Sequence, residues 1–289
     1  MTSLLPTATR TVFIDVDGTI LEHGSVIAPS TVTAIRAARA NGHLVYLCTG
    51  RSAGDLHPLV RAIGFDGAIT NGGAFATRGN ELVVSHVMPR ADVDRMVGYF
   101  DEHGIHYFLQ THQAVFASEG IGAFAGEFFR QRRARHSEDL RRLGLDAEEE
   151  PLPALRYRPI DGIDYDTVAK STFISPQSDT LARVEDALGD RFHVIPGSIP
   201  MPGGSNGEVA VRGVNKGSAI VEVLALLERD TAGTVGIGDS WNDVEMFGVV
   251  ETAVAMGNAD PALQERAQHV TTGVLDDGVW NAFVTLGLI

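Results

Sequence analysis

The feature that most constrains this fold is a short apolar segment that ends at two carboxylates, the sequence TVFIDVDGTI at residues 11–20. Its β-branched and aromatic residues are typical of a buried strand, and we expect this strand to end just before Asp15. Asp15 and Asp17 point the same way in an extended chain, and Gly18 allows a sharp turn after them. Two like charges this close need a positive partner, and a hard divalent cation such as Mg²⁺ suits oxygen ligands. The alternative interpretation is an ordinary Asp-Gly turn beside an incidental aspartate.

Composition and charge place the chain among ordinary globular proteins. Its 289 residues are enough for two domains or one large domain, and 44% hydrophobic with 21% charged residues excludes a disordered chain. The formal net charge of -14 argues against nucleic acid or an anionic membrane as the main partner, because both demand clustered Lys and Arg. A small anionic substrate remains allowed, since a metal and a few local cations can reverse the sign inside one pocket.

The single cysteine, Cys48, excludes an intramolecular disulfide. It ends an apolar strand, so we interpret it as a buried structural residue rather than a thiol nucleophile. Residues 1–10 lack the apolar core of a signal peptide, and no stretch of the sequence is long and apolar enough to cross a bilayer. We therefore expect a cytoplasmic protein that does not insert into membranes.

The pattern of residues 11–83 predicts strands that alternate with helices. Helical periodicity over 29–41 ends at an Asn-Gly stop signal, and a second helix is expected over 56–63. Strands are predicted at 43–48 and 67–70. This rhythm indicates right-handed βαβ units, and therefore an α/β fold with a Rossmann-like parallel sheet and helices on both faces.

All strands of such a sheet end at one edge, and ligands bind at that edge. Polar residues follow three of the predicted strands directly, at Asp15, Thr49 and Asn71. We therefore expect these residues to share one crevice with Asp17, although they are far apart in the sequence.

The texture of the sequence changes near residue 84 and changes back near residue 211. Helical segments mix with alternating strands between these positions, which predicts an α+β cap domain of residues 84–211 inserted into the first fold. One of its predicted helices covers 119–135. The basic run 130–142 is interpreted as a solvated face, with contact to an anionic substrate or partner as the alternative.

Parallel-sheet texture returns after the insert, so residues 1–83 and 212–289 are predicted to form one core domain. A helix is expected at 219–228, followed by a strand at 234–238 that ends at Asp239. Asp239 is therefore expected at the same edge of the sheet as Asp15.

Four short motifs lie at strand or helix ends on this predicted edge: Asp15-x-Asp17-Gly18-Thr19, Thr49-Gly50-Arg51, Lys216, and Gly238-Asp239-x-x-Asn242-Asp243. Each motif alone is a weak signal, because short motifs occur by chance. In this order they resemble the four motifs of the haloacid dehalogenase superfamily. The position of the insert between the second and third motifs, and its mixed texture, resemble the Cof-type or class IIB branch. The resemblance spans nearly the whole chain, with the cap matched by placement rather than by motif.

The resemblance implies a phosphoryl-transfer site. Asp15 would be the nucleophile and form an aspartyl-phosphate, while Asp17 would act as general acid and then as general base. Mg²⁺ would be held by the Asp15 carboxylate, the Asp17 backbone carbonyl and Asp239. Because dehalogenases and phosphonate-cleaving relatives lack an acid at the position of Asp17, its presence favours cleavage of a phosphate ester.

The resemblance also implies how the phosphoryl group would be bound. Thr49, with the backbone N–H of Gly50, would donate hydrogen bonds to its oxygens, and Lys216 would supply a fixed positive charge. Two residues on the same edge are interpreted as contacts for substrate or phosphate rather than as structural turn residues: Arg51 and Asn71. Two more would orient Lys216, the metal-bound waters or the phosphate: Asn242 and Asp243.

The expected function is hydrolysis of phosphomonoesters by a Mg²⁺-dependent phosphatase. Its partner would be a small phosphorylated metabolite, with a sugar phosphate as the foremost class by resemblance. The cap would close over the site and recognise the leaving group. Two alternatives stay open: a phosphomutase or phosphotransferase that passes the phosphoryl group to a sugar, and a non-catalytic sensor of a phosphorylated ligand.

Overall fold

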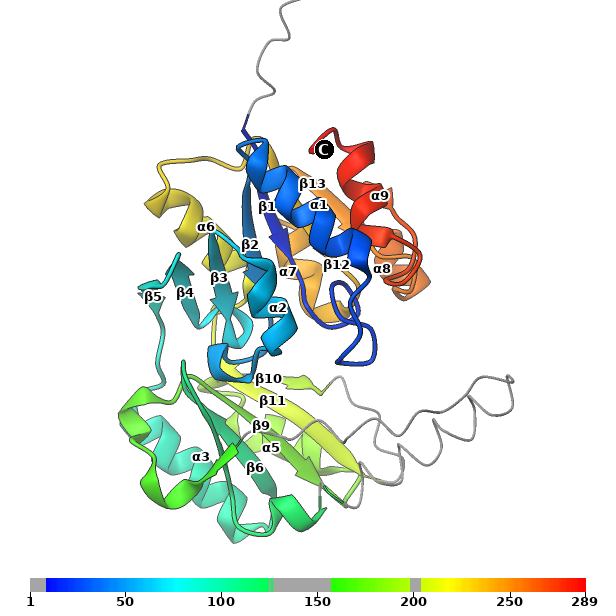
Figure 1. The fold of residues 1–289 in the computed structure, drawn as a ribbon. Helices are drawn as coiled ribbons and strands as arrows, with labels where there is room; N and C mark the ends of the chain where they lie inside the picture. Colours follow the sequence, from blue (N-terminus) through cyan, green and yellow to red (C-terminus); the bar gives the residue numbers. More distant parts are fainter. Residues whose placement is uncertain (1–8, 125, 127–156, 198–203) are drawn as a thin grey trace, which may run out of the picture. The chain divides into compact units, whose positions relative to one another are not determined.

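The structure is a computed structural model that describes residues 9–124, 126, 157–197 and 204–289. The chain forms two compact units. The core unit comprises Met1–Val87 and Val211–Ile289, and the insert unit comprises Met88–Ala210 (Figure 1). The insert unit begins after residue 84 because the last strand of the first segment continues to Ser85 as part of the sheet of the core unit.

An eight-stranded sheet forms the centre of the core unit. From one edge to the other its strands are β14 (His269–Val270), β13 (Thr252–Ala255), β12 (Thr234–Gly238), β1 (Thr11–Ile14), β2 (Leu44–Cys48), β3 (Gly67–Thr70), β4 (Phe75–Arg78) and β5 (Glu81–Ser85). Neighbouring strands from β14 to β3 pair in parallel, which confirms the predicted parallel sheet.

A hairpin of β4 and β5 extends this sheet in the antiparallel direction and was not predicted. The two strands are joined by Gly79 and Asn80 alone, and Gly79 has a φ of 58°. A two-residue Gly-Asn connection is a hairpin signal, so the sequence did contain the information. The hairpin ends at Ser85, and the chain then enters the insert unit.

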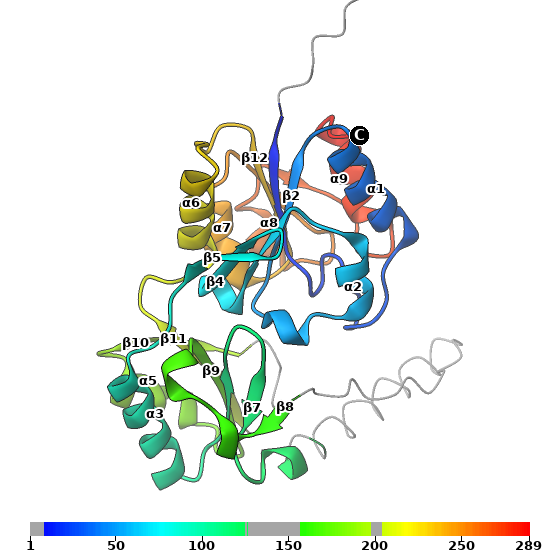
Figure 2. The same ribbon diagram turned by 60° about the vertical axis from the view of Figure 1, so that its left-hand side comes forward.

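Helices cover both faces of the sheet, as the sequence predicted (Figure 2). One face packs against α1 (Pro29–Ala40), α2 (Pro58–Ile63) and α9 (Gly278–Thr285), and the other against α6 (Lys216–Leu226), α7 (Val244–Phe247) and α8 (Pro261–Gln264). Side chains alternate between the two faces along a strand, so Val12 and Ile14 join the first cluster and Phe13 joins the second. A strand buried on both faces needs a continuous apolar run, which the segment at residues 11–14 supplies.

The insert unit has its own six-stranded sheet. Its strands, in spatial order, are β10 (Phe192–Pro196), β11 (Ser205–Val211), β9 (Lys170–Ser175), β6 (His106–Gln110), β7 (Val115–Ala117) and β8 (Tyr157–Pro159). The helices α3 (Arg90–Glu102) and α5 (Thr180–Leu188) belong to the same unit, and Phe100 of α3 packs on Tyr107 and Phe173 of the sheet. This is the mixed α+β texture that the sequence indicated. The predicted helix at 119–135 lies within the described residues only as far as 124 and at 126, and the basic run 130–142 lies outside them.

Cys48 is buried at the end of β2, as predicted for a structural cysteine. Burial raises the pKa of its thiol, which keeps the sulfur in its unreactive protonated form. Across the residues that the structure describes, no helix combines the length and the apolar character needed to cross a bilayer.

Candidate active site

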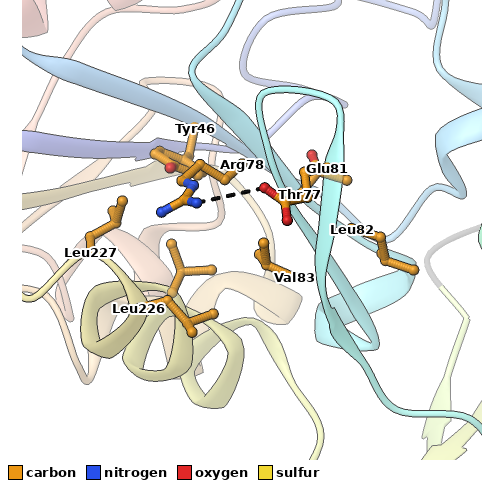
Figure 3. A pocket seen from close by; sticks show the side chains of 9 residues that line it. Tyr46, Thr77, Arg78, Glu81, Leu82, Val83, Leu226 and Leu227 are labelled. Atoms are coloured by element: carbon orange, nitrogen blue, oxygen red, sulfur yellow. Dashed lines mark ion pairs between the residues drawn. The ribbon is translucent and has the colours of Figure 1, made fainter.

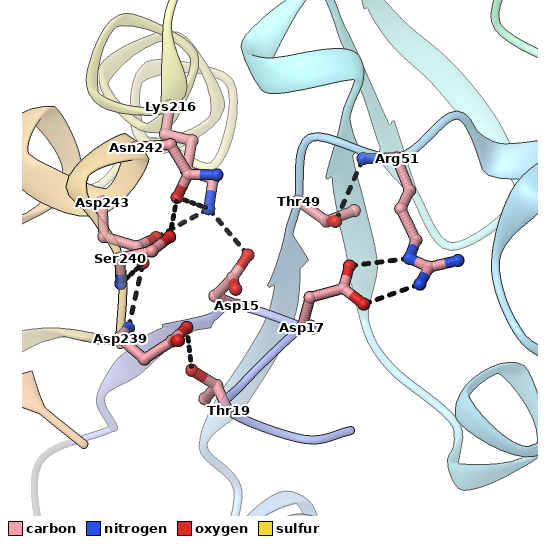
Figure 4. A network of polar contacts seen from close by, with 10 residues as sticks. All are labelled: Asp15, Asp17, Thr19, Thr49, Arg51, Lys216, Asp239, Ser240, Asn242 and Asp243. Carbon is pink, nitrogen blue, oxygen red and sulfur yellow. Dashed lines mark hydrogen bonds and ion pairs between the residues drawn. The ribbon is translucent and has the colours of Figure 1, made fainter. Parts of the chain in front are cut away.

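The strand register brings the predicted site residues to one edge of the core sheet. Ile14 of β1 lies level with Ile237 of β12 on one side and with Leu47 of β2 on the other. The chain therefore leaves these three strands at nearly the same level. Asp15 follows Ile14 directly, Asp239 follows Gly238 at the end of β12, and Thr49 follows Cys48 at the end of β2. Figure 4 shows Asp15 and Asp239 on one side of this edge and Asp17, Thr49 and Arg51 on the other.

Lys216 is the first residue of α6, and its side chain is only 2% exposed. Asn215 caps the helix through a capping box with Ser218, which fixes where the lysine leaves the backbone. The Lys216 ammonium donates to Asp15 Oδ1 at 2.7 Å, to Asp243 Oδ1 at 2.6 Å and to Asn242 Oδ1 at 3.1 Å (Figure 4). Three acceptors match the three protons of an ammonium group, so this buried charge is fully satisfied.

Charge and burial oppose each other around Lys216. Burial alone would lower the pKa of Lys216, but the carboxylates of Asp15 and Asp243 outweigh it and raise that pKa, so the ammonium stays charged. Burial raises the pKa of Asp15, and Asp243 adds to this shift, whereas Lys216 counteracts it. Asp15 therefore needs nearby positive charge to remain an ionised carboxylate, which is the form that can attack phosphorus.

Asp243 ties the loop after β12 to Lys216. Its Oδ1 accepts from the lysine, and its Oδ2 accepts from the backbone N–H groups of Asp239 and Ser240, both at 3.1 Å. The side chain is fully buried, at the end of the short 3₁₀ helix Trp241–Asp243. Both of its oxygens thus accept hydrogen bonds that hold Lys216 and the backbone of residues 239 and 240 in place.

An acidic cluster lies beside this network, formed by Asp15, Asp239 and Asp243, which each offer one oxygen within 4.8 Å of the others. Because hydrogen bonds occupy Asp243, the two carboxylates best placed to bind a cation are those of Asp15 and Asp239. Hard oxygen donors suit Mg²⁺, so these residues fit the ion that the sequence predicted. The Asp17 side chain is not in the cluster, which leaves only its backbone carbonyl as the predicted ligand.

The electrostatics of Asp239 also favour a cation. Burial raises the pKa of Asp239 to about 7, and the nearby Asp243 carboxylate contributes to the increase, while Lys216 and a hydrogen bond from Thr19 oppose it. A divalent cation beside Asp239 would favour the ionised form of this carboxylate and so offset the effect of burial.

Gly18 lets Asp239 approach the loop that carries Asp17. A Cβ at position 18 would lie 2.1 Å from Asp239 Oδ2, and the φ of Gly18 is +80°. Two residues that were given no role from the sequence support this close approach. Thr19 Oγ1 donates to Asp239 Oδ1 at 3.3 Å, and Asn258 Nδ2 donates to the Gly18 carbonyl at 2.9 Å. Asn258 could have been identified from the sequence as a polar residue in the loop after β13, because β13 ends at the same edge of the sheet as β12.

Asp17 and Arg51 form a bidentate ion pair. Arg51 Nε donates to Asp17 Oδ2 at 2.7 Å, and Nη2 donates to Asp17 Oδ1 at 2.6 Å (Figure 4). The hydrogen bonds to Asp17 raise the pKa of the Arg51 guanidinium, despite the opposing effect of burial. From the sequence we expected Arg51 to contact substrate or phosphate, and its pairing with Asp17 was not foreseen.

The remaining predicted residues surround the same loop. Thr49 is buried, and its Oγ1 accepts from the Arg51 backbone N–H at 3.1 Å, which leaves the hydroxyl hydrogen to donate elsewhere. Gly50 lies between these two residues. Asn71 has a left-handed φ of 54°, and its backbone N–H donates to the Arg51 carbonyl at 2.8 Å. The loops after β2 and β3 are therefore joined at Arg51.

The core unit also has a cavity of about 370 Å³, whose lining residues are drawn in Figure 3. It is lined by Tyr46, Arg78 and Leu226 among others, and Arg78 forms an ion pair with Glu81 at 3.6 Å. Leu226 is the last residue of α6, whereas Lys216 is the first, so the cavity lies at the opposite end of that helix. None of the predicted site residues lines it.

The chain is similar to several known phosphatases in sequence and in fold. The chain is 28% identical over 288 residues to the Bacillus subtilis protein named "Putative phosphatase YkrA". The match covers 97% of this chain and 98% of that protein. It is 25% identical to the B. subtilis 5-amino-6-(5-phospho-D-ribitylamino)uracil phosphatase YwtE, over 93% of this chain and 95% of that one. The solved structure of the HAD subclass IIB sugar phosphatase BT4131 has the same fold, with a TM-score of 0.76 at 20% identity over 97% of this chain and all of that chain.

The pattern of one protein family matches residues 12–283, from the second residue of β1 to within α9. That match spans both segments of the core unit together with the insert unit. It confirms the resemblance that the four motifs had indicated. The chain belongs to the haloacid dehalogenase-like hydrolase family.

Proposed function

We propose that this hydrolase is a Mg²⁺-dependent phosphatase that cleaves phosphomonoesters of small metabolites through an aspartyl-phosphate on Asp15. The observation that carries the proposal is the buried Lys216 ammonium, 2.7 Å from Asp15 Oδ1, next to an acidic cluster that suits a divalent cation. A carboxylate can attack an anionic phosphoryl group only where fixed positive charge offsets the repulsion. This edge of the sheet provides both the carboxylate and the means to hold the charge.

In the first step an Asp15 oxygen attacks phosphorus, and the bond from phosphorus to the ester oxygen breaks. Asp17 gives a proton to that oxygen, so the leaving group departs as an alcohol. In the second step Asp17 takes a proton from water, whose oxygen attacks phosphorus and releases inorganic phosphate from Asp15. Mg²⁺ held by Asp15 and Asp239 would neutralise charge on the phosphoryl group, Lys216 would supply a fixed positive charge beside Asp15, and Thr49 would donate a hydrogen bond to a phosphoryl oxygen.

The names of related proteins support a small substrate. YwtE is named for a phosphorylated ribitylaminouracil, and an Escherichia coli relative, 23% identical over 91% of this chain, is named a pyridoxal phosphate phosphatase. The structural relative BT4131 is described as a sugar phosphatase. All three names refer to phosphate esters of small polar molecules. We propose a phosphorylated sugar or a compound with a phosphorylated sugar-like chain as the substrate class.

Release of inorganic phosphate tests this proposal. Purified protein is incubated with Mg²⁺ and either p-nitrophenyl phosphate or a panel of sugar phosphates. We expect phosphate release that stops when EDTA removes the metal and when Asp15→Asn removes the nucleophile. An isomeric sugar phosphate formed without phosphate release would establish the phosphomutase alternative. Binding of a phosphorylated ligand with no turnover of any ester would establish the sensor alternative.

A further inference from the structure

Two carboxylates that are two residues apart have different cationic partners in this structure. Asp15 pairs with the buried Lys216, whereas both oxygens of Asp17 pair with Arg51. The planar guanidinium matches a carboxylate through two parallel hydrogen bonds, which fixes the orientation as well as the distance. Within the described part of the chain, the Asp17 carboxylate accepts a hydrogen bond from no other residue.

Arg51 is itself held firmly on its side of the site. Its backbone N–H donates to Thr49 Oγ1, and its carbonyl accepts from Asn71 N–H. The Nη1 atom donates to the Asp55 carbonyl at 3.3 Å and lies 3.5 Å from Asp55 Oδ2. The Arg51 side chain is 27% exposed, and the Asp17 side chain is 48% exposed. The better-packed residue therefore orients the more exposed one.

Building on the proposed function, we propose that Arg51 is the positioning residue for the acid–base carboxylate of Asp17. Proton transfer to a leaving oxygen requires a separation of about 2.6–3.2 Å, and a displacement of about 1 Å costs about 100-fold in rate. A half-exposed aspartate in a loop would otherwise sample several side-chain rotamers. When Asp17 is protonated, one of its oxygens would carry the proton toward the leaving oxygen while the other would still accept from Arg51. Arg51 would thus limit the orientation of Asp17 in both protonation states, and its contribution would be seen only in steps that need Asp17.

Leaving groups separate this role from direct phosphoryl binding. An alkyl phosphate such as glycerol 2-phosphate needs a proton on its departing oxygen, whereas 2,4-dinitrophenyl phosphate releases a stable phenolate without one. The value of kcat/KM reports attack on the substrate and departure of this group. We expect Arg51→Gln to lower kcat/KM by about 100-fold for the alkyl ester and only slightly for the dinitrophenyl ester.

Two further variants make the test specific. Arg39→Gln is the matched control, because Arg39 forms a bidentate pair with Asp66 at 3.0 and 2.9 Å in the core unit but contacts none of the proposed site residues. It should leave the ratio between the two substrates unchanged. In an Asp17→Asn background, Arg51→Gln should cause no further loss on the alkyl ester, since coupled residues are not additive. Arg51→Lys keeps the positive charge but cannot form the two parallel hydrogen bonds of the guanidinium. It should therefore not restore the wild-type ratio of kcat/KM between the two esters.

Equal losses on both esters, with a wild-type enzyme that is active, would overturn this inference and assign Arg51 to phosphoryl binding instead. Additive losses in the Asp17→Asn background would also overturn it, and so would a wild-type ratio of the two kcat/KM values in Arg51→Gln. A wild-type protein that hydrolyses neither ester would overturn the proposed function and this inference together. Thermal unfolding of each variant shows whether a loss reflects folding, and a variant that does not fold is replaced by Arg51→Lys for the same comparison.

Discussion

The Lys216 ammonium lies 2.7 Å from Asp15 Oδ1, although 201 positions separate the two residues in the sequence. Asp15 belongs to the first segment of the core unit and Lys216 to the second, with the whole insert unit between them in the chain. The contact therefore joins the two segments at the edge where the proposed chemistry takes place. Because both side chains are buried, neither charge can be removed without leaving its partner unbalanced.

Replacement of this lysine should affect stability and activity together. We expect Lys216→Met to lower the free energy of unfolding by about 3–5 kcal/mol, because Asp15 and Asp243 would be left as buried carboxylates without a cation. Phosphate release should fall by at least about 100-fold. Urea unfolding and phosphate assays measure the two effects.

A double variant separates these two effects. Lys216→Met combined with Asp243→Asn removes one of the unbalanced charges, so it should regain part of the stability but none of the activity. Wild-type stability in Lys216→Met alone would contradict the assigned network.

The raised pKa of Asp239 predicts how magnesium and pH interact. Its folded-state pKa of about 7 lies above the value of about 4 expected in the unfolded chain. Without metal, the folded protein therefore binds an extra proton between these values, and its stability falls as the pH rises through that window. Since Mg²⁺ binds the ionised carboxylate, the increase in Tm that Mg²⁺ causes should be larger at pH 8 than at pH 6.

Two variants check that this effect belongs to Asp239. Asp239→Asn should abolish the Mg²⁺-dependent increase in Tm at both pH values. Asp190→Asn should preserve it, because Asp190 is an exposed carboxylate of the insert unit that pairs with Arg95. A Tm increase of the same size at pH 6 and pH 8 in the wild-type protein would argue against a metal ligand that titrates in this range.

Because Gly18 packs against the Asp239 carboxylate, a larger residue at position 18 should weaken metal binding. In Gly18→Ala the new methyl group would meet the Asp239 carboxylate, so we expect Mg²⁺ affinity and phosphate release to fall together. Gly42→Ala is the matched control, since Gly42 also has a positive φ, +91°, but a Cβ there would meet nothing within 4 Å. Both variants should lose about 1–2 kcal/mol of stability from backbone strain. Isothermal titration with Mg²⁺ distinguishes them, and equal affinities in the two variants would show that Asp239 does not depend on this contact.

Much of this site could be predicted because strand ends converge in a parallel sheet. Once β1 and β12 were recognised as neighbours of one sheet, Asp15 and Asp239 had to lie at the same edge, whatever their separation in sequence. Lys216 was placed with them through the resemblance to the haloacid dehalogenase motifs, and the structure has it as the first residue of α6. For the residues that follow strands, topology decides the proximity, and topology is encoded in the order of strands and helices.

Contacts between side chains on neighbouring loops could not be predicted in the same way. The pairing of Arg51 with Asp17 depends on the rotamers of both side chains, and the sequence equally allowed Arg51 to face a ligand. Thr19 and Asn258 support the cluster through single hydrogen bonds that no spacing rule specifies. The hairpin of β4 and β5 was missed for a different reason, since its Gly-Asn turn was a readable signal that the change in texture near residue 84 obscured.

The two proposed roles of Asp17 predict different fates for the phosphorylated enzyme. With 2,4-dinitrophenyl phosphate, whose leaving group needs no proton, Asp17→Asn should still transfer the phosphoryl group to Asp15 but should hydrolyse it slowly, because no base activates water. Acid quenching after mixing with ³²P-labelled substrate should therefore trap more labelled protein in Asp17→Asn than in the wild type. Asp15→Asn should trap none. Since Asp17 contributes no side-chain oxygen to the acidic cluster, Mg²⁺ affinity should change little in Asp17→Asn. Hydrolysis at the wild-type rate in Asp17→Asn would contradict the acid–base assignment.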